Sequence, residues 1–318
     1  MGSIHESTRY RRRGFIGSNI VDGAINAGHD VSIVDDLSTG NRRWVNPKAR
    51  FYEVDIRSAE LDDVIAQEKP DVICHQAARA NVRESFELPL LYAEVNVVGS
   101  VNLLESARKH GVKRIVYAST GGACYGEPEQ VPVPENHPVN PLDPYGASKH
   151  HVEHYLFLYK ANFGIDYAIL RYPNVFGPRQ DPRGEAGVVA IFAMHMLEGG
   201  EPKINGDGSQ VRDFMFIDDV VSANLCAFEK GSGIYNVGWS KGTSVNEIFD
   251  SLKSATGYKG PKIHGPAKQG EVQRIYLDSR RAQAELGWQP KVGLDEGLSR
   301  TVAFLTEEMQ RSLTGASA

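Results

Sequence analysis

The feature that most constrains the fold is a series of short apolar runs in the first half of the chain, separated by helix-length stretches. The runs occupy residues 31–34, 72–74, 114–117 and 167–170. Each run is nearly continuous in apolar residues, as is typical of strands that are buried on both faces of a parallel sheet. Residues 94–110 instead repeat apolar side chains at helical spacing. This alternation predicts an α/β fold built on a doubly wound parallel sheet.

The length of 318 residues fits about two domains of roughly 150 residues each. Glycine and proline cluster at residues 177–184, and shorter helices and strands follow, whereas residues 210–230 look like a return to the first domain. We therefore expect a nucleotide-binding domain from residues 1–173 and 211–240, and a smaller α+β substrate domain from residues 174–210 and 241–318.

Composition excludes several classes of function. The 40 acidic residues exceed the 35 basic ones, which leaves no basic excess for a nucleic-acid partner. No apolar window is long enough to cross a membrane, and the arginine-rich start is not followed by the apolar run of a secretory signal. The three cysteines are widely spaced and form neither a metal pattern nor a disulfide framework, so we expect a cytoplasmic protein without a metal; they are Cys74, Cys124 and Cys226.

The strongest catalytic motif is Ser119-Thr120 at a strand end, followed by Tyr145 and Lys149. A tyrosine and a lysine four residues apart lie on one face of a helix. The lysine ammonium favours the phenolate, so the tyrosine can act as a base below its ordinary pKa of about 10. The two hydroxyl groups could bind the same substrate oxygen. The alternative is that Tyr145 only starts a helix and that Lys149 is solvated. The motif follows a Ser-Thr pair at the end of a strand in a parallel sheet, which makes this alternative the weaker interpretation.

A second motif points to a dinucleotide. Gly14 and Gly17 open a helix, and Asp35-Asp36 end the next strand about 20 residues later, where a carboxylate binds the adenosine ribose. An acidic residue there favours NAD over NADP; a solvated turn is the alternative. Further strand ends, which would flank the adenine and pyrophosphate, contribute Asp55, Ile56, Ala77 and Ala78.

The second half offers two candidate groups for a sugar or a phosphate. Asn174 ends a strand with a side-chain amide, and Arg212 follows a flexible glycine-rich turn. A guanidinium can bind a phosphate through a planar fork. An ion pair of Arg212 with Asp213 or Asp218 is the alternative.

Together these motifs resemble the extended short-chain dehydrogenase/reductase family, and within it the bacterial and archaeal UDP-glucose 4-epimerases. The resemblance runs from Gly14 to about Leu305 and is most specific at residues 117–128, 144–149 and 171–192. It implies a Rossmann fold, NAD as cofactor, a UDP-sugar as substrate and a homodimer formed through the helices around Val97 and His154.

The resemblance also implies roles for individual residues. Tyr145 would be the base, Lys149 its partner and the ligand of the nicotinamide ribose, and Thr120, with Ser119, the hydroxyl on the sugar. Residues implied to hold NAD are Gly14, Ile16, Gly17, Asp35, Asp36, Asn41, Asp55, Ile56, Ala77, Ala78, Asn96, Tyr145, Lys149 and Tyr172. Residues implied to line the UDP-sugar pocket are Thr120, Tyr145, Asn174, Val188, Arg212, Lys268, Glu271 and Ile275.

The implied reaction is transient oxidation of the sugar at C4, rotation of the 4-keto sugar and return of the hydride to its other face. Related dehydratases carry an Asp-Glu pair after the strand-end threonine, whereas Gly121-Gly122 follow here, which argues against dehydration. The alternatives are another NAD-dependent nucleotide-sugar enzyme, such as a UDP-glucuronate epimerase or decarboxylase, and a non-catalytic nucleotide-sugar-binding protein.

Two positions in the second half depart from the family pattern. Lys268 stands where many 4-epimerases have an arginine, so a point charge replaces a bidentate fork. Ile275 stands where some members carry a tyrosine, and a smaller wall there would admit an N-acetyl group on the sugar.

The largest departure is at the start of the chain. The family opens with an apolar strand and a glycine loop, whereas residues 7–13 read Ser-Thr-Arg-Tyr-Arg-Arg-Arg, with Arg11 at the first glycine position. A side chain there crowds the tight turn and the approach of the backbone to a pyrophosphate. We therefore expect a damaged first strand and phosphate loop.

A reading-frame error would explain this segment. Codons for Thr-Arg-Tyr-Arg-Arg-Arg at residues 8–13, read one base forward, can spell Leu-Val-Thr-Gly-Gly-Ala. One restored base then returns to the frame of Gly14. We hypothesise a one-base deletion just before Gly14. Codons in the gene that cannot spell the glycine loop in the shifted frame would refute this hypothesis.

Overall fold

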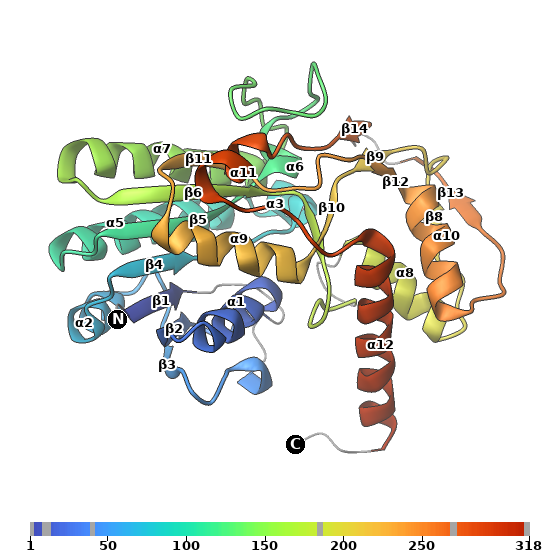
Figure 1. The fold of residues 1–318 in the computed structure, drawn as a ribbon, viewed down its shortest axis with the longest axis horizontal. Helices are drawn as coiled ribbons and strands as arrows, with labels where there is room; N and C mark the ends of the chain where they lie inside the picture. The colour runs from blue at the N-terminus through green and yellow to red at the C-terminus, as the bar shows by residue number, and fades with distance from the viewer. Residues whose placement is uncertain (1–2, 8–13, 39–41, 183–186, 268–271, 315–318) are drawn as a thin grey trace.

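The computed structural model describes residues 3–7, 14–38, 42–182, 187–267 and 272–314. Its centre is a seven-stranded parallel sheet in the order β11-β6-β5-β4-β1-β2-β3 (Figure 1). The strands are β1 (Ser3–Ser7), β2 (Asp30–Asp35), β3 (Arg50–Glu53), β4 (Val72–His75), β5 (Arg114–Thr120), β6 (Asp166–Tyr172) and β11 (Gly233–Asn236). The strand order reverses beside β1, which is where doubly wound sheets bind their ligands.

Four of these strands confirm the sequence prediction. The apolar runs at 31–34, 72–74, 114–117 and 167–170 lie inside β2, β4, β5 and β6. All seven residues of β5 are buried, as expected of a central strand covered on both faces. The predicted α/β class with a doubly wound parallel sheet is therefore confirmed.

The expectation of a lost first strand needs correction. Strand β1 forms over Ser3–Ser7, upstream of the segment in which the sequence showed no apolar pattern. It pairs in parallel with β2, Ser7 opposite Val34, and with β4, Ser7 opposite His75. A β-ladder is made by backbone N–H and C=O groups, so a polar segment between two paired neighbours can still form a strand. The arginine-containing residues 8–13 lie outside the described part of the chain.

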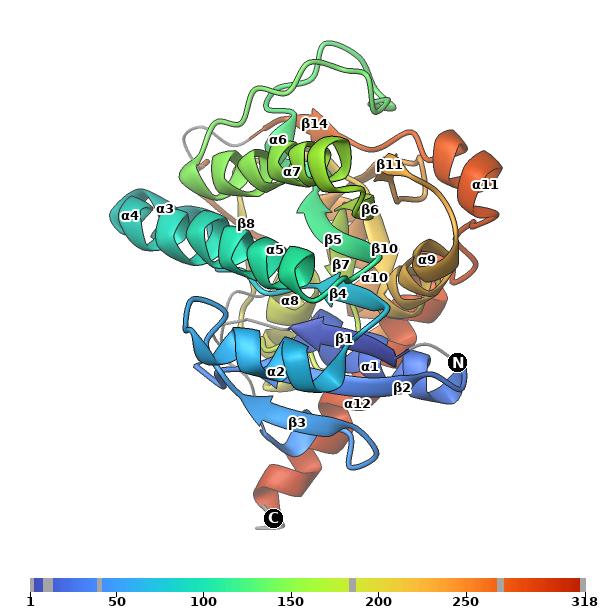
Figure 2. The same ribbon diagram turned by 90° about the vertical axis from the view of Figure 1, so that its left-hand side faces the viewer.

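Helices cover both faces of the sheet (Figure 2). One layer contains α2 (Glu60–Glu68), α5 (Gly99–Lys109) and α7 (Pro144–Phe163), and the other contains α1 (Phe15–Asn26) and α9 (Ile217–Glu229). Leu103 and Leu156 belong to the apolar core under the first layer, and Ile20 and Val220 to that under the second. After the segment 174–216, which lies outside these layers, residues 217–236 again belong to them, since α9 covers one face and β11 extends the sheet beside β6.

The segment 174–216 and most of the C-terminal part of the chain form a second group of elements, at the right of Figure 1. Helices α8 (Val188–Leu197), α10 (Val245–Thr256) and α12 (Leu294–Leu313) pack together there. Three small sheets accompany them, with the strand orders β10-β7, β12-β9-β14 and β13-β8. Their strands are β7 (Asn174–Phe176), β8 (Lys203–Asn205), β9 (Val211–Arg212), β10 (Phe214–Phe216), β12 (Thr243–Ser244), β13 (Ile263–Gly265) and β14 (Arg274–Ile275).

Short elements complete the chain. They are the 3₁₀-helix η1 (Arg42–Trp44), α3 (Val82–Glu87), α4 (Pro89–Tyr92), the π-helix η2 (Ala93–Val98), α6 (Gly121–Cys124) and α11 (Arg280–Leu286). No helix within the described residues is long and apolar enough to cross a membrane.

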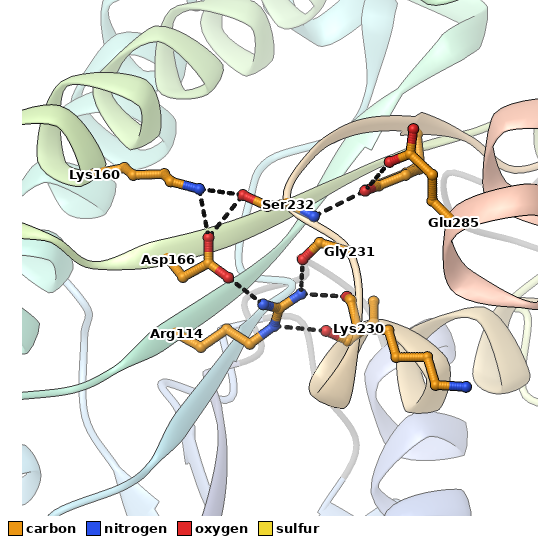
Figure 3. A network of polar contacts seen from close by, with 9 residues as sticks. Arg114, Lys160, Asp166, Lys230, Gly231, Ser232 and Glu285 are labelled. Carbon is orange, nitrogen blue, oxygen red and sulfur yellow. Dashed lines mark hydrogen bonds and ion pairs between the residues drawn. The ribbon is translucent and has the colours of Figure 1, made fainter.

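Arg114, at the start of β5, ties three elements together at the amino end of the sheet (Figure 3). Its guanidinium donates to the carbonyl oxygens of Ala227 (2.8 Å), Lys230 and Gly231 (2.5 Å), at the C-terminal end of α9. It also donates to Asp166 at the start of β6 (2.5 Å). A cation placed on the last carbonyls of a helix satisfies acceptors that have no intrahelical partner. This contact fixes α9 against the sheet, at the edge opposite the strand ends that carry the predicted site.

Candidate active site

The predicted catalytic residues lie where β5 ends and α7 begins. Thr120, the last residue of β5, caps α6, because its Oγ1 accepts the backbone N–H of Ala123 (3.2 Å). Asp143 caps α7 by accepting the N–H of Gly146 (2.7 Å), and Pro144 occupies the first helical turn, where its missing N–H costs nothing. These caps start α7 just before Tyr145, in the position that the sequence predicts.

Close packing of α6 against α7 holds Tyr145 near the end of β5. A Cβ atom added to Gly146 would lie 2.6 Å from the backbone oxygen of Ala123, so only glycine permits this approach. The oxygen of Thr120 is already an acceptor, but its hydroxyl can still donate a hydrogen to a substrate oxygen. The structure therefore packs the first turn of α7, which carries Tyr145, against α6, which follows Thr120, and a shared contact of the two side chains with a substrate stays a prediction.

Lys149 lies on the inner face of α7, with only 3% of its surface exposed. Its ammonium stands over the ring of Tyr117, 4.4 Å from the centroid. Burial lowers the pKa of Lys149 to about 7, and the negative charge of Glu153 opposes this effect. The alternative of a solvated lysine is therefore wrong.

A buried ion pair that the sequence analysis missed stands behind Lys149. Glu153 lies one helical turn further along α7 and accepts two hydrogen bonds from Arg171 of β6, at 2.9 and 2.5 Å. Ser119 donates to the same carboxylate (2.6 Å). Its hydroxyl hydrogen is thus directed to Glu153, which leaves Thr120 as the strand-end hydroxyl able to donate toward a sugar.

His75, at the end of β4, faces the same region. Its Nε2 lies 2.7 Å from the hydroxyl of Ser100, and its ring packs against Tyr117. Burial, and then the charge of Lys149, lower the pKa of His75 to about 3. His75 is therefore neutral at physiological pH and adds no second cation beside Lys149.

The predicted cofactor residues line the carboxyl ends of the strands around β1. Gly14 caps the N-terminus of α1, and Ile16 and Gly17 are buried in its first turn. Asp35 ends β2, is buried and accepts the N–H of Leu37 (2.7 Å). Other predicted cofactor residues follow the ends of strands. Asp36 accepts hydrogen bonds from Ser38, and Asp55 accepts them from Arg57. The buried ones are Ile56, Ala77 and Ala78.

Two of the predicted cofactor residues have protein partners instead. Asn96 accepts the N–H of Arg79 (2.7 Å) and donates to the Arg79 oxygen (3.0 Å) and to Ser148 (2.8 Å), so its amide ties the segment after β4 to α7. The hydroxyl of Tyr172 accepts from Asn224 (2.8 Å) in a buried network. In this structure both side chains position neighbouring elements, and their direct contact with a cofactor stays a prediction.

The predicted substrate residues are distributed around the second group of elements. Asn174 starts β7, half-buried, and its N–H donates to the Asp213 oxygen (3.0 Å). Val188 opens α8, half-buried. Arg212 lies in β9, where its Nη1 donates to the Val211 oxygen (2.9 Å).

The acidic residues offered as alternative partners of Arg212 have partners of their own. Asp213 accepts backbone N–H groups, among them that of Trp239 (3.0 Å), and Asp218 pairs with Arg300 (2.6 Å).

Ile275, which the sequence places as a smaller wall of the sugar pocket, is the second residue of β14. It pairs with Arg212 along the β14–β9 ladder, but its side chain is buried at 2% exposure in a cluster with Cys124 and Leu277. Burial in that cluster stabilises the apolar side chain, and the room that Ile275 leaves for an N-acetyl group on the sugar stays a prediction. The other predicted residues Asn41, Lys268 and Glu271 lie outside the described part of the chain.

Comparison with known proteins identifies the family. Residues 12–238 match the NAD dependent epimerase/dehydratase family. The chain belongs to this family. The match spans β2 to β11 and includes Thr120, Tyr145 and Lys149, so the predicted catalytic residues lie inside the matched region.

Individual relatives are similar over nearly their whole length. A putative UDP-glucose 4-epimerase of Methanocaldococcus jannaschii is 51% identical over 92% of this chain and 95% of its own. The crystal structure of UDP-glucose 4-epimerase with UDP-glucose from Thermotoga maritima has a TM-score of 0.93 at 43% identity and covers 96% of this chain and 99% of its own. The crystal structure of the Thermus thermophilus UDP-glucose 4-epimerase complex with NAD has a TM-score of 0.89 at 40% identity, over 95% and 99%.

Proposed function

We propose that this protein is an NAD-dependent epimerase that inverts C4 of a UDP-hexose, interconverting UDP-glucose and UDP-galactose. The observation that carries the proposal is the burial of Lys149 one helical turn after Tyr145 on α7, with Thr120 at the end of β5. Gly121 and Gly122 follow Thr120, so no carboxylate stands there to drive elimination. The identities of 51% and 43% to UDP-glucose 4-epimerases support the same reaction.

The residues around β1 and β2 fit NAD. The buried carboxylate of Asp35 ends β2, where a ribose hydroxyl is bound in this fold. The N-terminus of α1 at Gly14 offers backbone N–H groups and a positive dipole to a pyrophosphate. Ala77 and Ala78, just after β4, have only methyl side chains and so would leave room for the cofactor at this strand end. When bound, NAD supplies a reversible hydride acceptor for C4.

The protein's own part in the reaction is the movement of one proton and the positioning of the sugar. Tyr145 takes the proton of the 4-hydroxyl and later returns it, while the Lys149 ammonium stabilises the phenolate. Thr120 donates to the same sugar oxygen. Asn174, Val188 and Arg212 are placed to hold the nucleotide-sugar, and their contacts with it are part of the proposal.

The experiment compares two proteins, the chain as it stands and a version in which residues 8–13 read Leu-Val-Thr-Gly-Gly-Ala. Each is purified, assayed for bound NAD by absorbance and fluorescence, and mixed with UDP-galactose. Bound NAD and turnover in the first protein would show that the arginines are accommodated. Cofactor and turnover only in the second would show that the glycine loop was lost by a frame error.

The alternatives give different results in this assay. Turnover of UDP-glucuronate without turnover of UDP-galactose would assign another enzyme of the family. Binding of UDP-galactose by both proteins without cofactor or turnover would indicate a nucleotide-sugar-binding protein and refute the epimerase.

We further propose that the protein is a homodimer formed through one helical face. Exposed apolar side chains gather on adjacent elements, with Leu90 of α4 at 78%, Val98 of η2 at 58% and Phe157 of α7 at 53% exposure. His154, which stacks on Phe157, lies on the same side of α7. Contiguous apolar patches of this kind mark interaction sites. A second copy fits because a two-fold axis pairs such a patch with itself.

The test is the molar mass in solution by light scattering. We expect a dimer for the wild type and a monomer for Phe157→Glu, since a carboxylate would be buried in the interface. Leu313→Glu is the control, because Leu313 is also exposed but lies at the end of α12. A wild-type monomer, or a Phe157→Glu dimer, would refute this interface.

We also propose a cytoplasmic location. The three cysteines, all within the described residues, form no disulfide, which suits a reducing compartment. Recovery of the tagged protein in a periplasmic or secreted fraction would contradict this assignment.

A further inference from the structure

Glu153 and Arg171 form the most completely buried ion pair in the described part of the chain, with 2% and 1% of their side chains exposed. Such a pair costs desolvation energy and is weak evidence for stability. Two parallel hydrogen bonds join the guanidinium to the carboxylate, and the third arm of the guanidinium donates to Tyr125 (2.8 Å). The carboxylate is therefore held in one orientation by the sheet.

The fixed carboxylate faces two residues of the candidate active site. Its Oε1 accepts the hydroxyl of Ser119 (2.6 Å), and its charge acts on Lys149, one helical turn before it. His150 adds a contact at 3.1 Å on the outer side. Burial alone would raise the pKa of Glu153, but the hydrogen bonds, chiefly from Arg171, hold it at about 2. The carboxylate is thus ionised at every pH at which the enzyme works.

No other carboxylate acts on Lys149 among the described contacts. His75 of β4 is neutral, and Tyr117 of β5 presents its ring face. Tyr145, one turn earlier on α7, is the group that Lys149 serves. Burial disfavours an ammonium, so a fixed negative charge is needed to keep Lys149 protonated.

We propose that Glu153, clamped by Arg171, is a positioning residue that keeps Lys149 in its ammonium form and turns the Ser119 hydroxyl away from the sugar. This inference rests on the proposed function, in which the ammonium stabilises the Tyr145 phenolate. Without the carboxylate Lys149 would lose its proton at lower pH, and the base would lose its partner.

The direct test is the titration of Lys149 itself, which needs no turnover. Protein labelled with ¹³C-lysine is titrated by NMR, and the Lys149 resonance is assigned by its absence from Lys149→Met. In Glu153→Gln we expect the titration midpoint of Lys149 to fall by about one pH unit or more, the size of effect of a nearby opposite charge. An unchanged midpoint would overturn the proposal.

Two further variants separate charge from structure. Ser119→Ala removes one hydrogen bond but leaves the carboxylate, so the Lys149 midpoint is expected to stay at its wild-type value. Glu153→Gln can fail to fold because Arg171 is left buried and unpaired. The double variant Glu153→Gln/Arg171→Gln removes both charges, and the Lys149 midpoint is still expected to fall, since the charge of Glu153 is the one that acts on Lys149. A wild-type midpoint in the folded double variant would also overturn the proposal.

The pH profile of UDP-galactose turnover is the second readout, measured in the version with the glycine loop if the original chain binds no NAD. Its alkaline limb is expected to move to lower pH in Glu153→Gln by the shift seen for Lys149. Equal loss of rate at every pH would indicate a structural role only. Absence of turnover in both the original chain and the version with the glycine loop would refute the epimerase while leaving the NMR test of Glu153 intact.

Discussion

Replacing Arg114 by methionine is expected to destabilise the fold without affecting the chemistry. The side chain is about one-tenth exposed and donates to the carbonyl oxygens of Ala227, Lys230 and Gly231 and to Asp166 (Figure 3). Methionine fills a similar volume but leaves the acceptors at the end of α9 without that donor. Leaving a buried acceptor without its donor costs about 1–3 kcal/mol for each group, so the loss of the three carbonyl contacts is expected to total about 3–5 kcal/mol.

The cost converts into a measurable change. With an unfolding entropy of about 2.1 cal/mol/K per residue, a chain of 318 residues loses about 5–7 °C in Tm for that free energy. Thermal unfolding by circular dichroism and urea unfolding by tryptophan fluorescence measure it. NAD binding and turnover are expected to stay at the wild-type level, because Arg114 starts β5 and Thr120 ends it.

The neighbouring residue provides a matched control. Lys113 pairs with Asp71 at 2.8 Å, but both side chains are exposed, and such a pair contributes about 0.2–1 kcal/mol. Lys113→Met is therefore expected to lower Tm by at most about 1–2 °C. If Arg114→Met loses no more stability than Lys113→Met, the contact at the end of α9 is not an anchor and the reasoning is refuted.

Three further predictions concern the site. Tyr145→Phe is expected to lower kcat by about 10²- to 10⁴-fold with little change in KM, as measured by steady-state kinetics. A change in KM with an unchanged kcat would contradict this expectation. Gly146→Ala is expected to lower both Tm and kcat, because its Cβ would lie 2.6 Å from the Ala123 oxygen, whereas Gly293→Ala, with open space around it, serves as the control. The pKa of Glu153 is about 2 in the fold against an ordinary value of 4.5, so its stabilisation is present above about pH 4.5 and is lost as pH falls toward 2. The difference in unfolding free energy between wild type and Glu153→Gln is therefore expected to shrink from about pH 5 to about pH 3, and a constant difference would contradict this.

The strands that could be predicted from sequence are those whose side chains are buried on both faces. Strands β2, β4, β5 and β6 read as apolar runs because helices cover them on each side. Strand β1 reads Ser-Ile-His-Glu-Ser, which has no such pattern. Its formation depends on ladders to β2 and β4, and pairing between residues distant in sequence is not visible in a local pattern.

The site shows the same division. The spacing of Tyr145 and Lys149 is local, so a helix places them on one face whatever the rest of the chain does. The contact of Arg171 with Glu153 depends on how β6 lies under α7, and no spacing rule indicates it. The hydrogen bonds of the Asn96 amide with Arg79 and Ser148 likewise join segments that are distant in sequence, so no local pattern indicates them. Residue type indicates which contacts are possible, and packing decides which are made.

The amino and carboxyl ends of the central strands, called here the amino edge and the carboxyl edge of the sheet, have different roles in the protein. At the amino edge Arg114 fixes α9 to β5 and β6, and at the carboxyl edge the same two strands present Thr120 and Arg171. None of these contacts involves residues 8–13. We therefore expect the scaffold that holds Tyr145 and Lys149 to form whether residues 8–13 carry the arginines or the glycine loop. On the frame-error hypothesis, a fault in that segment would weaken the grip on the cofactor, and the version with the glycine loop would recover both NAD binding and turnover.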